Sequence, residues 1–325
     1  MRYDIITFGS VSQDIFVKAN SLKFKDEEGF YLPFDEKIEI KEIIFSSGGG
    51  GTNTAATFVK QGFKTAFCGA IGVDLAGLEV VRDLKKWGID TRLLIKKRGK
   101  LTNHSLILLN DDGKRAILTY RGASELVELS DIPWRKIKKT KWFYFAPITG
   151  LLCDKLKELV DFGWKNKIRI AMNPSINQLS LPETTLKEIF DKTEILFLNK
   201  QEASYLTKIS PDKELEIFKK IREFCRGIIV ITKGKDGVMV LKENYFYSAP
   251  ADRHLKVIDT TGAGDSFAAG FLSGYIRFNE DVQKAIQLGM ANASANISQI
   301  GAKTGILEKD QEFNPCEVRK QKFEL

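Results

Sequence analysis

Short hydrophobic runs alternate with longer amphipathic stretches along most of the chain. Runs of this kind are typical of buried strands and occur at residues 4–9, 64–72, 141–148, 168–175, 194–200 and 227–234. Between many of them, apolar residues recur at helical spacing over residues 52–61, 74–87, 151–162, 212–224, 265–276 and 282–300. This alternation predicts an α/β fold with a mainly parallel central sheet that is covered by helices on both faces.

Two segments interrupt the alternation, residues 16–46 and 101–120, and neither contains a helical pattern. In the second segment, two apolar runs flank the sequence DDGK at 111–114, which predicts a β-hairpin. We expect both segments to form extra β structure that projects from the main sheet as a lid. The alternative is that they are ordinary edge strands of the main sheet.

Composition fits a folded, water-exposed protein. Of 325 residues, 43% are hydrophobic and 28% charged, so we expect a packed core. No apolar run approaches the roughly 18 residues of a membrane span, and the first residues enter a strand without a signal-peptide pattern, so we expect no membrane partner and a cytoplasmic location. The few cysteines form no CxxC pair, which suits reduced structural thiols.

The net charge of +8 favours anionic partners, either nucleic acid or a small molecule that carries phosphate. The basic residues are spread over most of the chain, and their densest cluster, RKIKKTK at 135–141, fits a solvated helix face better than a nucleic-acid patch. Nucleic acid is therefore the less favoured partner.

One stretch near the end of the chain combines small residues, an acid and a helical pattern. From Asp265 onward, Phe267, Phe271 and Tyr275 recur every four residues, which predicts an amphipathic helix. The run Gly262–Ala263–Gly264 would then lie at the helix N-terminus, where main-chain N–H groups lack helical partners. Small side chains and the helix dipole would let an anion approach, so this run is a candidate anion hole for a phosphoryl group.

Asp265 has two readings: a simple helix cap, or a group that accepts a proton from an attacking hydroxyl beside a bound phosphate. We expect its pKa to be low, which makes it a weak base. A loose phosphoryl-transfer transition state requires little more than orientation and late proton acceptance.

The stretch DTTGAGDSFAAGFLSGYI at 259–276 resembles the C-terminal signature of the ribokinase-like (PfkB) carbohydrate kinase family. The glycine-rich SSGGGGTNTAATFVKQG at 46–62 resembles the other signature of that family, in the right order and spacing. The resemblance implies a ribokinase-like three-layer sandwich over residues 1–310, with a discontinuous β lid from about 14–46 and 98–122. Residues 311–325 would be a polar, loosely held tail.

The resemblance also implies ATP-dependent phosphorylation of a sugar or nucleoside hydroxyl. Asp265 would be the catalytic base, and the N–H groups of Gly262, Ala263 and Gly264 would stabilise the transferring phosphate. Asp259 resembles a residue at the monovalent-cation site of the family, which would hold K⁺.

Further motifs resemble the nucleotide site of the family. Asn199 and Glu202, in NKQE, would organise Mg²⁺ largely through water; the alternative is a capping box that starts a helix. Residues that would border the adenine nucleotide are Thr232, Gly234, Gly237 and Asn292, together with the segment AKTGI at 302–306.

At the substrate end, the resemblance assigns Asp14 to the sugar hydroxyls, and a carboxylate that accepts hydroxyl hydrogens suits a polyol. The opposite wall of this pocket would be formed by Gly49, Gly50, Gly51 and Asn53. No G-K-[ST] follows the glycines, so this is no Walker P-loop.

Gly50 departs from the family pattern, because ribokinases tend to carry lysine there. A free ribose becomes less secure as the substrate, and a nucleoside gains room. Arg121, after the predicted hairpin, would either reach an acidic substrate or be a solvated loop charge.

We therefore expect a sugar kinase that transfers the γ-phosphoryl group of ATP, with a nucleoside kinase as the alternative. A catalytically silent binding regulator is disfavoured because Asp265, Asn199 and Glu202 are all intact. Pairing of two lids into a homodimer would cover exposed strand edges.

Overall fold

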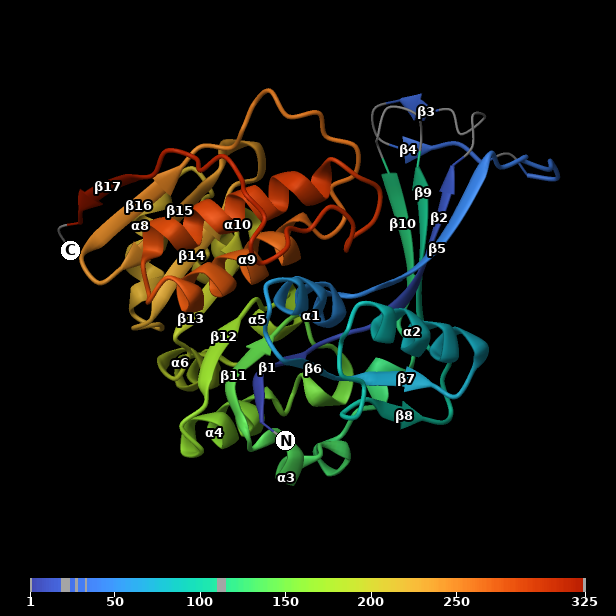
Figure 1. Cartoon of the computed structure of the whole chain (residues 1–325), viewed down its shortest axis with the longest axis horizontal. Helices are drawn as coiled ribbons and strands as arrows, with labels where there is room; N and C mark the ends of the chain where they lie inside the picture. Colours follow the sequence, from blue (N-terminus) through green and yellow to red (C-terminus); the bar gives the residue numbers. More distant parts are fainter. Residues whose placement is uncertain (1, 19–23, 27–28, 33, 110–114, 324–325) are drawn as a thin grey trace.

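A computed structural model describes residues 2–18, 24–26, 29–32, 34–109 and 115–323. In these residues, nine strands form one sheet in the order β17-β16-β15-β14-β13-β12-β11-β1-β6. The strands are β1 (Tyr3–Phe8), β6 (Thr65–Cys68), β11 (Thr140–Phe145), β12 (Arg169–Met172), β13 (Ile195–Asn199), β14 (Ile228–Thr232), β15 (Val238–Lys242), β16 (Tyr245–Ala249) and β17 (Arg319–Lys322). The strands from β6 to β14 pair in parallel, whereas β14–β15, β15–β16 and β16–β17 pair antiparallel. This confirms the predicted mainly parallel sheet (Figure 1).

Helices cover both faces of the sheet. They are α1 (Gly50–Lys60), α2 (Leu75–Lys86), α3 (Trp134–Ile137), α4 (Leu156–Lys165), α5 (Ile176–Leu179), α6 (Glu183–Asp191), α7 (Lys200–Thr207), α8 (Glu214–Arg222), α9 (Ala263–Arg277) and α10 (Val282–Ile297). Short 3₁₀ turns occur at Ala123–Leu126, Leu129–Asp131, Gly150–Leu152 and Gly234–Asp236.

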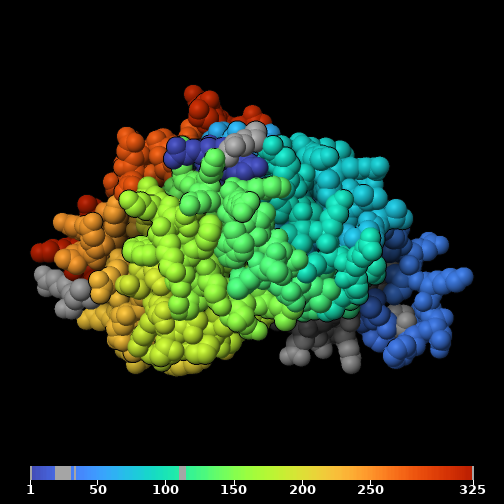
Figure 2. Space-filling model, turned by 90° about the horizontal axis from the view of Figure 1, so that it is seen from below, coloured from blue at the N-terminus to red at the C-terminus, as the bar shows by residue number. Residues whose placement is uncertain are grey.

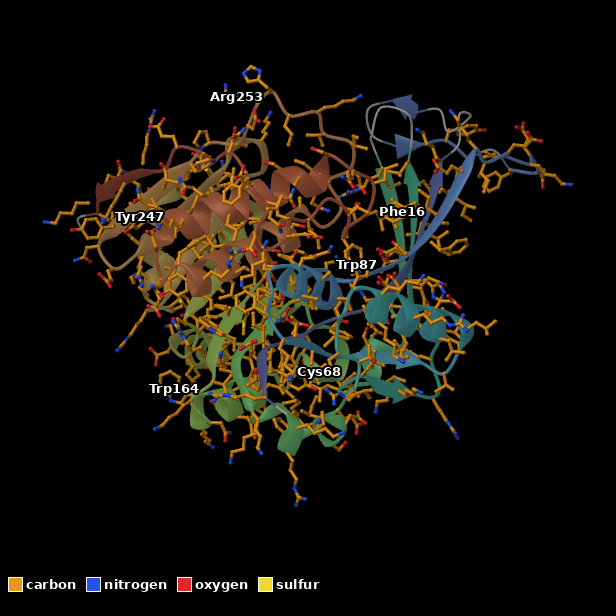
Figure 3. The ribbon with its side chains drawn as sticks, in the orientation of Figure 1. Phe16, Cys68, Trp87, Trp164, Tyr247 and Arg253 are labelled. Carbon is orange, nitrogen blue, oxygen red and sulfur yellow. The ribbon has the colours of Figure 1, made fainter. Side chains whose placement is uncertain are left out.

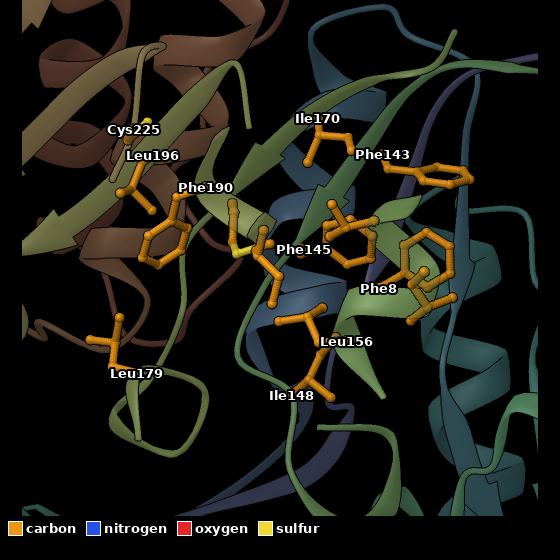
Figure 4. Packing of buried hydrophobic residues seen from close by; sticks show 14 of the residues in the cluster. Phe8, Phe143, Phe145, Ile148, Leu156, Ile170, Leu179, Phe190, Leu196 and Cys225 are labelled. Carbon is orange, nitrogen blue, oxygen red and sulfur yellow. The ribbon is translucent and has the colours of Figure 1, made fainter. Parts of the chain in front are cut away.

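The alternation of side chains along each strand produces two cores. On β1, Phe8 faces the core beneath α4, α6 and α8, whereas Ile5 faces the core beneath α1, α9 and α10. On β11, Phe143 and Phe145 join the first core and Tyr144 the second (Figure 4). Because full burial of a phenylalanine is worth about 1.5–3 kcal/mol, these rings fix the strands in the three-layer order.

A separate four-stranded sheet, in the order β10-β9-β2-β5, stands away from the main sheet (Figure 1), and we call it the lid. Its strands are β2 (Ser12–Lys18), β5 (Glu42–Gly48), β9 (Asn103–Leu109) and β10 (Arg115–Tyr120). The expectation of extra β structure that projects from the main sheet is thus confirmed. The predicted hairpin joins β9 and β10, although its turn at 111–114 lies outside the described residues.

Two further strand pairs are small: β3 (Phe24–Asp26) with β4 (Gly29–Phe30), and β7 (Ala70–Gly72) with β8 (Ile95–Lys97).

Seen from below, the segment of the chain around β5 projects beyond the rounded body of the molecule (Figure 2, blue). Among the described helices, none is both long and apolar enough to cross a bilayer.

The end of the chain is not a loosely held tail. β17 pairs with β16, and the ring of Phe323 packs on Phe246 with centroids 4.4 Å apart. Cys316 and Val318 also pack against the core. The prediction was wrong because these few apolar side chains, spaced among charged ones, are enough to anchor the segment.

Candidate active site

Helix α9 begins at Ala263, two positions ahead of the predicted start, and Gly262 is its N-cap in the left-handed conformation, at φ 80°. A methyl group on Gly262 would lie 2.7 Å from Cβ of Ala302, so the position requires glycine for both backbone and space. Gly264 is exposed, and a methyl group there would meet no atom within 4 Å. The helix N-terminus is therefore open on the side of Gly264.

The main-chain N–H groups of Gly262, Gly264 and Asp265 have no acceptor among the described residues. The N–H of Ala263 differs, because it points to the carbonyl oxygen of Thr260 at 3.3 Å. Two members of the predicted anion hole thus keep free donors, while Ala263 is partly engaged by the protein. Asp265 adds a donor that the sequence reading did not include.

A second helix N-terminus meets the first at this point. Nδ2 of Asn53, on α1, donates to Oδ2 of Asp265 at 2.9 Å. A methyl group on Gly50 would lie 3.1 Å from Oδ1 of Asp265 and 3.0 Å from Cδ of Pro147. The glycine run was expected to face substrate, yet Asn53 and Gly50 also position the candidate base.

Burial raises the pKa of the Asp265 carboxyl, and the nearby charge of Asp14 raises it as well. The hydrogen bond from Asn53 and the charge of Lys303 act in the opposite direction. The expectation of a low pKa was wrong, because loss of water around the carboxylate outweighs these favourable contacts. Asp265 is consequently a stronger base than the sequence suggested.

Asp14, the predicted contact to the sugar hydroxyls, lies on β2 and is buried. Oγ of Ser12 donates to its Oδ1 at 2.6 Å, and burial raises its pKa. Its carboxylate occupies the space beside Gly48, where an added methyl group would lie only 1.8 Å from Oδ2. Gly48 therefore makes space for the Asp14 carboxylate, although the sequence predicted roles only for the three glycines that follow.

Those three glycines also fill tight positions at the start of α1. Gly49 is the N-cap at φ 91°, and a methyl group on it would lie 2.5 Å from the carbonyl oxygen of Ser10. A methyl group on Gly51 would lie 2.6 Å from the ring of Phe67. The run thus brings the backbone of α1 close to the strand ends beneath it.

Lys303 belongs to the segment 302–306 that was expected to border the adenine, but its role as a charge close to Asp14 and Asp265 was not foreseen. Its side chain is buried, and its Nζ donates to the carbonyl oxygen of Ser47 on β5. Burial lowers its pKa to about 8, although the charges of Asp14, Asp83 and Asp265 favour the protonated form. The available signal was a single lysine between small and apolar residues in GAKTGI, which is an unusual position for a charge.

A cavity of about 720 Å³ extends from the open N-terminus of α9. Its lining includes Thr232, Gly234, Gly237, Leu255, Val257, Gly264, Phe267, Met290, Ala293, Ser294 and Ile297. The predicted nucleotide loop, residues 232–237, therefore lies on the same cavity as the candidate anion hole. The chain above it carries Arg253, which is exposed at the rim (Figure 3).

Asn292 does not line this cavity. It is fully buried; its Nδ2 donates to the carbonyl oxygen of Ser266 at 2.7 Å, and its Oδ1 accepts from the N–H of Leu307 at 2.8 Å. The predicted contact between Asn292 and the nucleotide is therefore wrong, since both polar atoms serve to join α10 to its neighbours. Of the segment 302–306, none of the residues lines the cavity either.

Asn199 and Glu202 form the capping box that was the alternative reading. Oδ1 of Asn199 accepts from the N–H of Glu202, and Oε2 of Glu202 accepts from the N–H of Asn199, both at 2.8 Å. Burial raises the pKa of Glu202, and the charge of Asp265 raises it further. In the described residues no cluster of three ligating side chains could hold a metal directly, so Mg²⁺ fits here only through water.

Both oxygens of the Asp259 carboxylate already have partners within the protein. Its Oδ1 accepts from Nη1 of Arg115 at 2.8 Å and from the N–H of Thr261 at 2.8 Å, and its Oδ2 accepts from the N–H of Gly301 at 2.9 Å. The residues present therefore do not fit the predicted K⁺ role of Asp259, because a guanidinium already balances its charge. Arg121, by contrast, is exposed.

The chain is similar to known proteins in both sequence and fold. A model of the pfkB family carbohydrate kinases matches residues 4–310. The chain is 25% identical to a probable fructokinase-5 of Arabidopsis thaliana over 82% of this chain and 81% of that protein. It is 26% identical to a nucleoside kinase of Methanothermobacter thermautotrophicus over 82% of this chain and 83% of that one. The structure of Arabidopsis thaliana ribokinase with ribose and ATP superposes with a TM-score of 0.76 at 20% identity, covering 95% of this chain and 97% of that one.

Proposed function

The chain belongs to the pfkB family of carbohydrate kinases, and we propose that it transfers the γ-phosphoryl group of ATP to a hydroxyl of a sugar, with Asp265 as the base. One observation carries the proposal. The Asp265 carboxylate lies where the N-termini of α1 and α9 meet, next to free N–H donors and at one end of the large cavity. A nucleotide in the cavity would place its terminal phosphate at those donors.

The chemistry asked of the protein is mainly positioning. The substrate hydroxyl would lie between Asp265 and the transferring phosphoryl group, with Asp14 holding other hydroxyls of the sugar. In a loose transition state, negative charge is spread over the phosphoryl oxygens, and the N–H groups of Gly262 and Gly264 would stabilise it. Asp265 would take the hydroxyl proton as the new P–O bond forms, and its raised pKa suits that task.

ATP as the phosphoryl donor is supported by the apolar lining of the cavity, which suits a purine, and by the ATP in the Arabidopsis thaliana ribokinase structure. Magnesium, when bound, would neutralise charge on the phosphates. Glu202 is the candidate to hold its waters, because the capping box uses Oε2 and leaves Oε1 without a partner among the described residues.

A nucleoside is the second candidate substrate, and the lid gives a reason to keep it. Phe16, labelled in Figure 3, lies two residues beyond Asp14 on β2 and thus on the same face. It belongs to a cluster with Ile107 against which Ile300, in the loop after α10, packs. Ile117 on β10 pairs with Ile107 and is 47% exposed. This apolar surface beyond the hydroxyl-binding carboxylate would suit a planar base.

The test is an ATP-consumption assay against ribose, fructose, 2-keto-3-deoxygluconate, adenosine, inosine and cytidine, run in parallel with Asp265→Asn. We expect turnover with at least one acceptor that the variant lacks. A preference for the nucleosides would select the second candidate. Inertness of the wild-type protein toward all acceptors would contradict both.

The outer face of the lid supports pairing into a homodimer. Ile43, Phe45 and Leu118 project from it and are exposed. Covering such a face in a second copy would remove apolar surface and open strand edges from water. Sedimentation of the wild type and of Phe45→Glu tests this, since the charge should convert a dimer to a monomer.

A further inference from the structure

Arg115 is a lid residue whose side chain ends in the loop that leads into α9. It is the first residue of β10, the lid strand on the side of α9 and α10 (Figure 1). Its Nη1 donates to Oδ1 of Asp259 at 2.8 Å and to Oγ1 of Thr261 at 2.5 Å. The pair therefore joins two parts of the chain that lie 144 positions apart.

Asp259 is a charge that needs this partner. Its side chain is only 1% exposed, and Arg115 is the cation that the described residues place on it. A buried carboxylate without a counter-charge is strongly unfavourable. The N–H groups of Thr261 and Gly301 hold the same carboxylate, so its position fixes two loops at once.

Those loops carry the anion hole and a second contact with the lid. Thr261 directly precedes Gly262, the left-handed N-cap of α9. Gly301 follows Ile300, which packs against Phe16 of β2. Seating of the lid and placement of the free N–H donors thus depend on one connected set of contacts.

We propose that Arg115 is a positioning residue that acts as the built-in counter-cation of Asp259. When the lid seats, the guanidinium fixes the loop at 259–262 and with it the N–H donors that receive the phosphoryl group. A dissolved monovalent cation is then unnecessary, because the lid supplies the charge. The kinetic part of this inference rests on the proposed kinase function.

The kinetic test compares Arg115→Ala and Arg115→Lys with Arg135→Ala, which removes an exposed arginine on α3. We expect Arg115→Ala to lower kcat by about 10²-fold, the typical cost of misplacing a catalytic group by about an ångström. The KM for ATP should change by less than about threefold, because the adenine end of the cavity is separate. Arg115→Lys should retain most of the activity, and Arg135→Ala all of it; a normal kcat in Arg115→Ala overturns the proposal.

The cation test replaces K⁺ by tetramethylammonium at constant ionic strength. The wild-type rate should stay within about twofold, whereas Arg115→Ala should regain activity with guanidinium or K⁺, because either can enter the vacated place beside Asp259. A wild type that requires K⁺ overturns the proposal, and so does a variant that neither cation restores.

A third measurement needs no substrate. Hydrogen–deuterium exchange of the amides at 259–264 in the free protein should be faster in Arg115→Ala than in the wild type or Arg135→Ala. Equal exchange in all three proteins overturns the coupling between lid and loop. If the exchange differs but no acceptor is phosphorylated, the proposed substrate class fails while the coupling stands.

Discussion

Nδ2 of Asn53 donates a hydrogen bond to Oδ2 of Asp265 at 2.9 Å, although 212 positions separate the two residues. This contact is made between the first turns of α1 and α9. The contact brings together the glycine-rich N-termini of two helices, one near each end of the chain, in a single candidate site.

Removal of the Asn53 amide should move the acid limb of the pH–rate profile. The hydrogen bond lowers the pKa of Asp265 against the effect of burial, so Asn53→Ala should raise that pKa further. Because Asp265 must be ionised to accept a proton, activity is present above its pKa and is lost as the pH falls through it. We expect the acid limb of kcat/KM to lie at higher pH in the variant, whereas the remote control Asn166→Ala should leave it in place. An unchanged limb in Asn53→Ala would show that Asn53 does not tune the pKa of Asp265.

Asp265→Asn should keep the fold and the nucleotide affinity but lower turnover by roughly 10²–10⁴-fold, the usual contribution of a positioned base. The amide is isosteric with the carboxylate but cannot accept the hydroxyl proton. Steady-state kinetics and calorimetry with ADP separate the two effects. A variant with near-normal turnover would exclude Asp265 as the base.

If Asp14 binds the sugar hydroxyls, its loss should raise the KM for the phosphoryl acceptor. Asp14→Ala should raise the KM for the acceptor about 10–100-fold, since a hydrogen bond to a charged group is worth about 1.5–3 kcal/mol. Gly48→Ala should do the same, because the new methyl group would lie 1.8 Å from Oδ2 of Asp14 and displace the carboxylate. The KM for ATP serves as the internal control, and a larger change there would misplace the pocket.

Lys303 predicts a pH dependence of stability. Its folded-state pKa is lowered from 10.5 to about 8, so between these values the unfolded chain holds a proton that the folded protein has released. In that window the contribution of Lys303 to the free energy of unfolding rises with pH, by at most about 1.4 kcal/mol per unit. In urea titrations, the free energy of unfolding of the wild type minus that of Lys303→Met should therefore rise from pH 8 to pH 10.

The control for that measurement is Lys136→Met, which removes an exposed lysine on α3. Its difference from the wild type should stay constant over the same range. A constant difference for Lys303→Met as well would show that this ammonium has its ordinary pKa in the folded protein.

Much of the fold could be read from the sequence because the signals are local. The apolar runs that became β1, β11 and β14 are continuous, and the four-residue spacing of Phe267, Phe271 and Tyr275 marks one face of α9. The glycine-rich starts of both helices were visible for the same reason. Local chemistry thus predicted that a glycine-rich helix N-terminus would occur close to Asp265.

The residues that sequence reading misplaced depend on contacts between distant segments. Lys303 gains its role because the chain after α10 returns to Ser47 at the base of the lid. The partner of Asp259, Arg115, could not be foreseen because it comes from a hairpin that no local pattern connects to Asp259. Asn292 has a polar side chain that could contact a ligand, but its amide group is hydrogen-bonded to the main chain of Ser266 and Leu307.

The last strand has a consequence for the integrity of the protein. β17 covers the hydrogen-bonding groups of β16 and presents Arg319, Lys320 and Lys322 as the new outer rim of the sheet. Positive side chains on such a rim discourage the addition of strands from other molecules. A chain cleaved before Arg319 would lose β17 and leave β16, with Tyr245 and Tyr247, as an unpaired edge strand. Proteolytic removal of this short segment should therefore make the enzyme prone to aggregation.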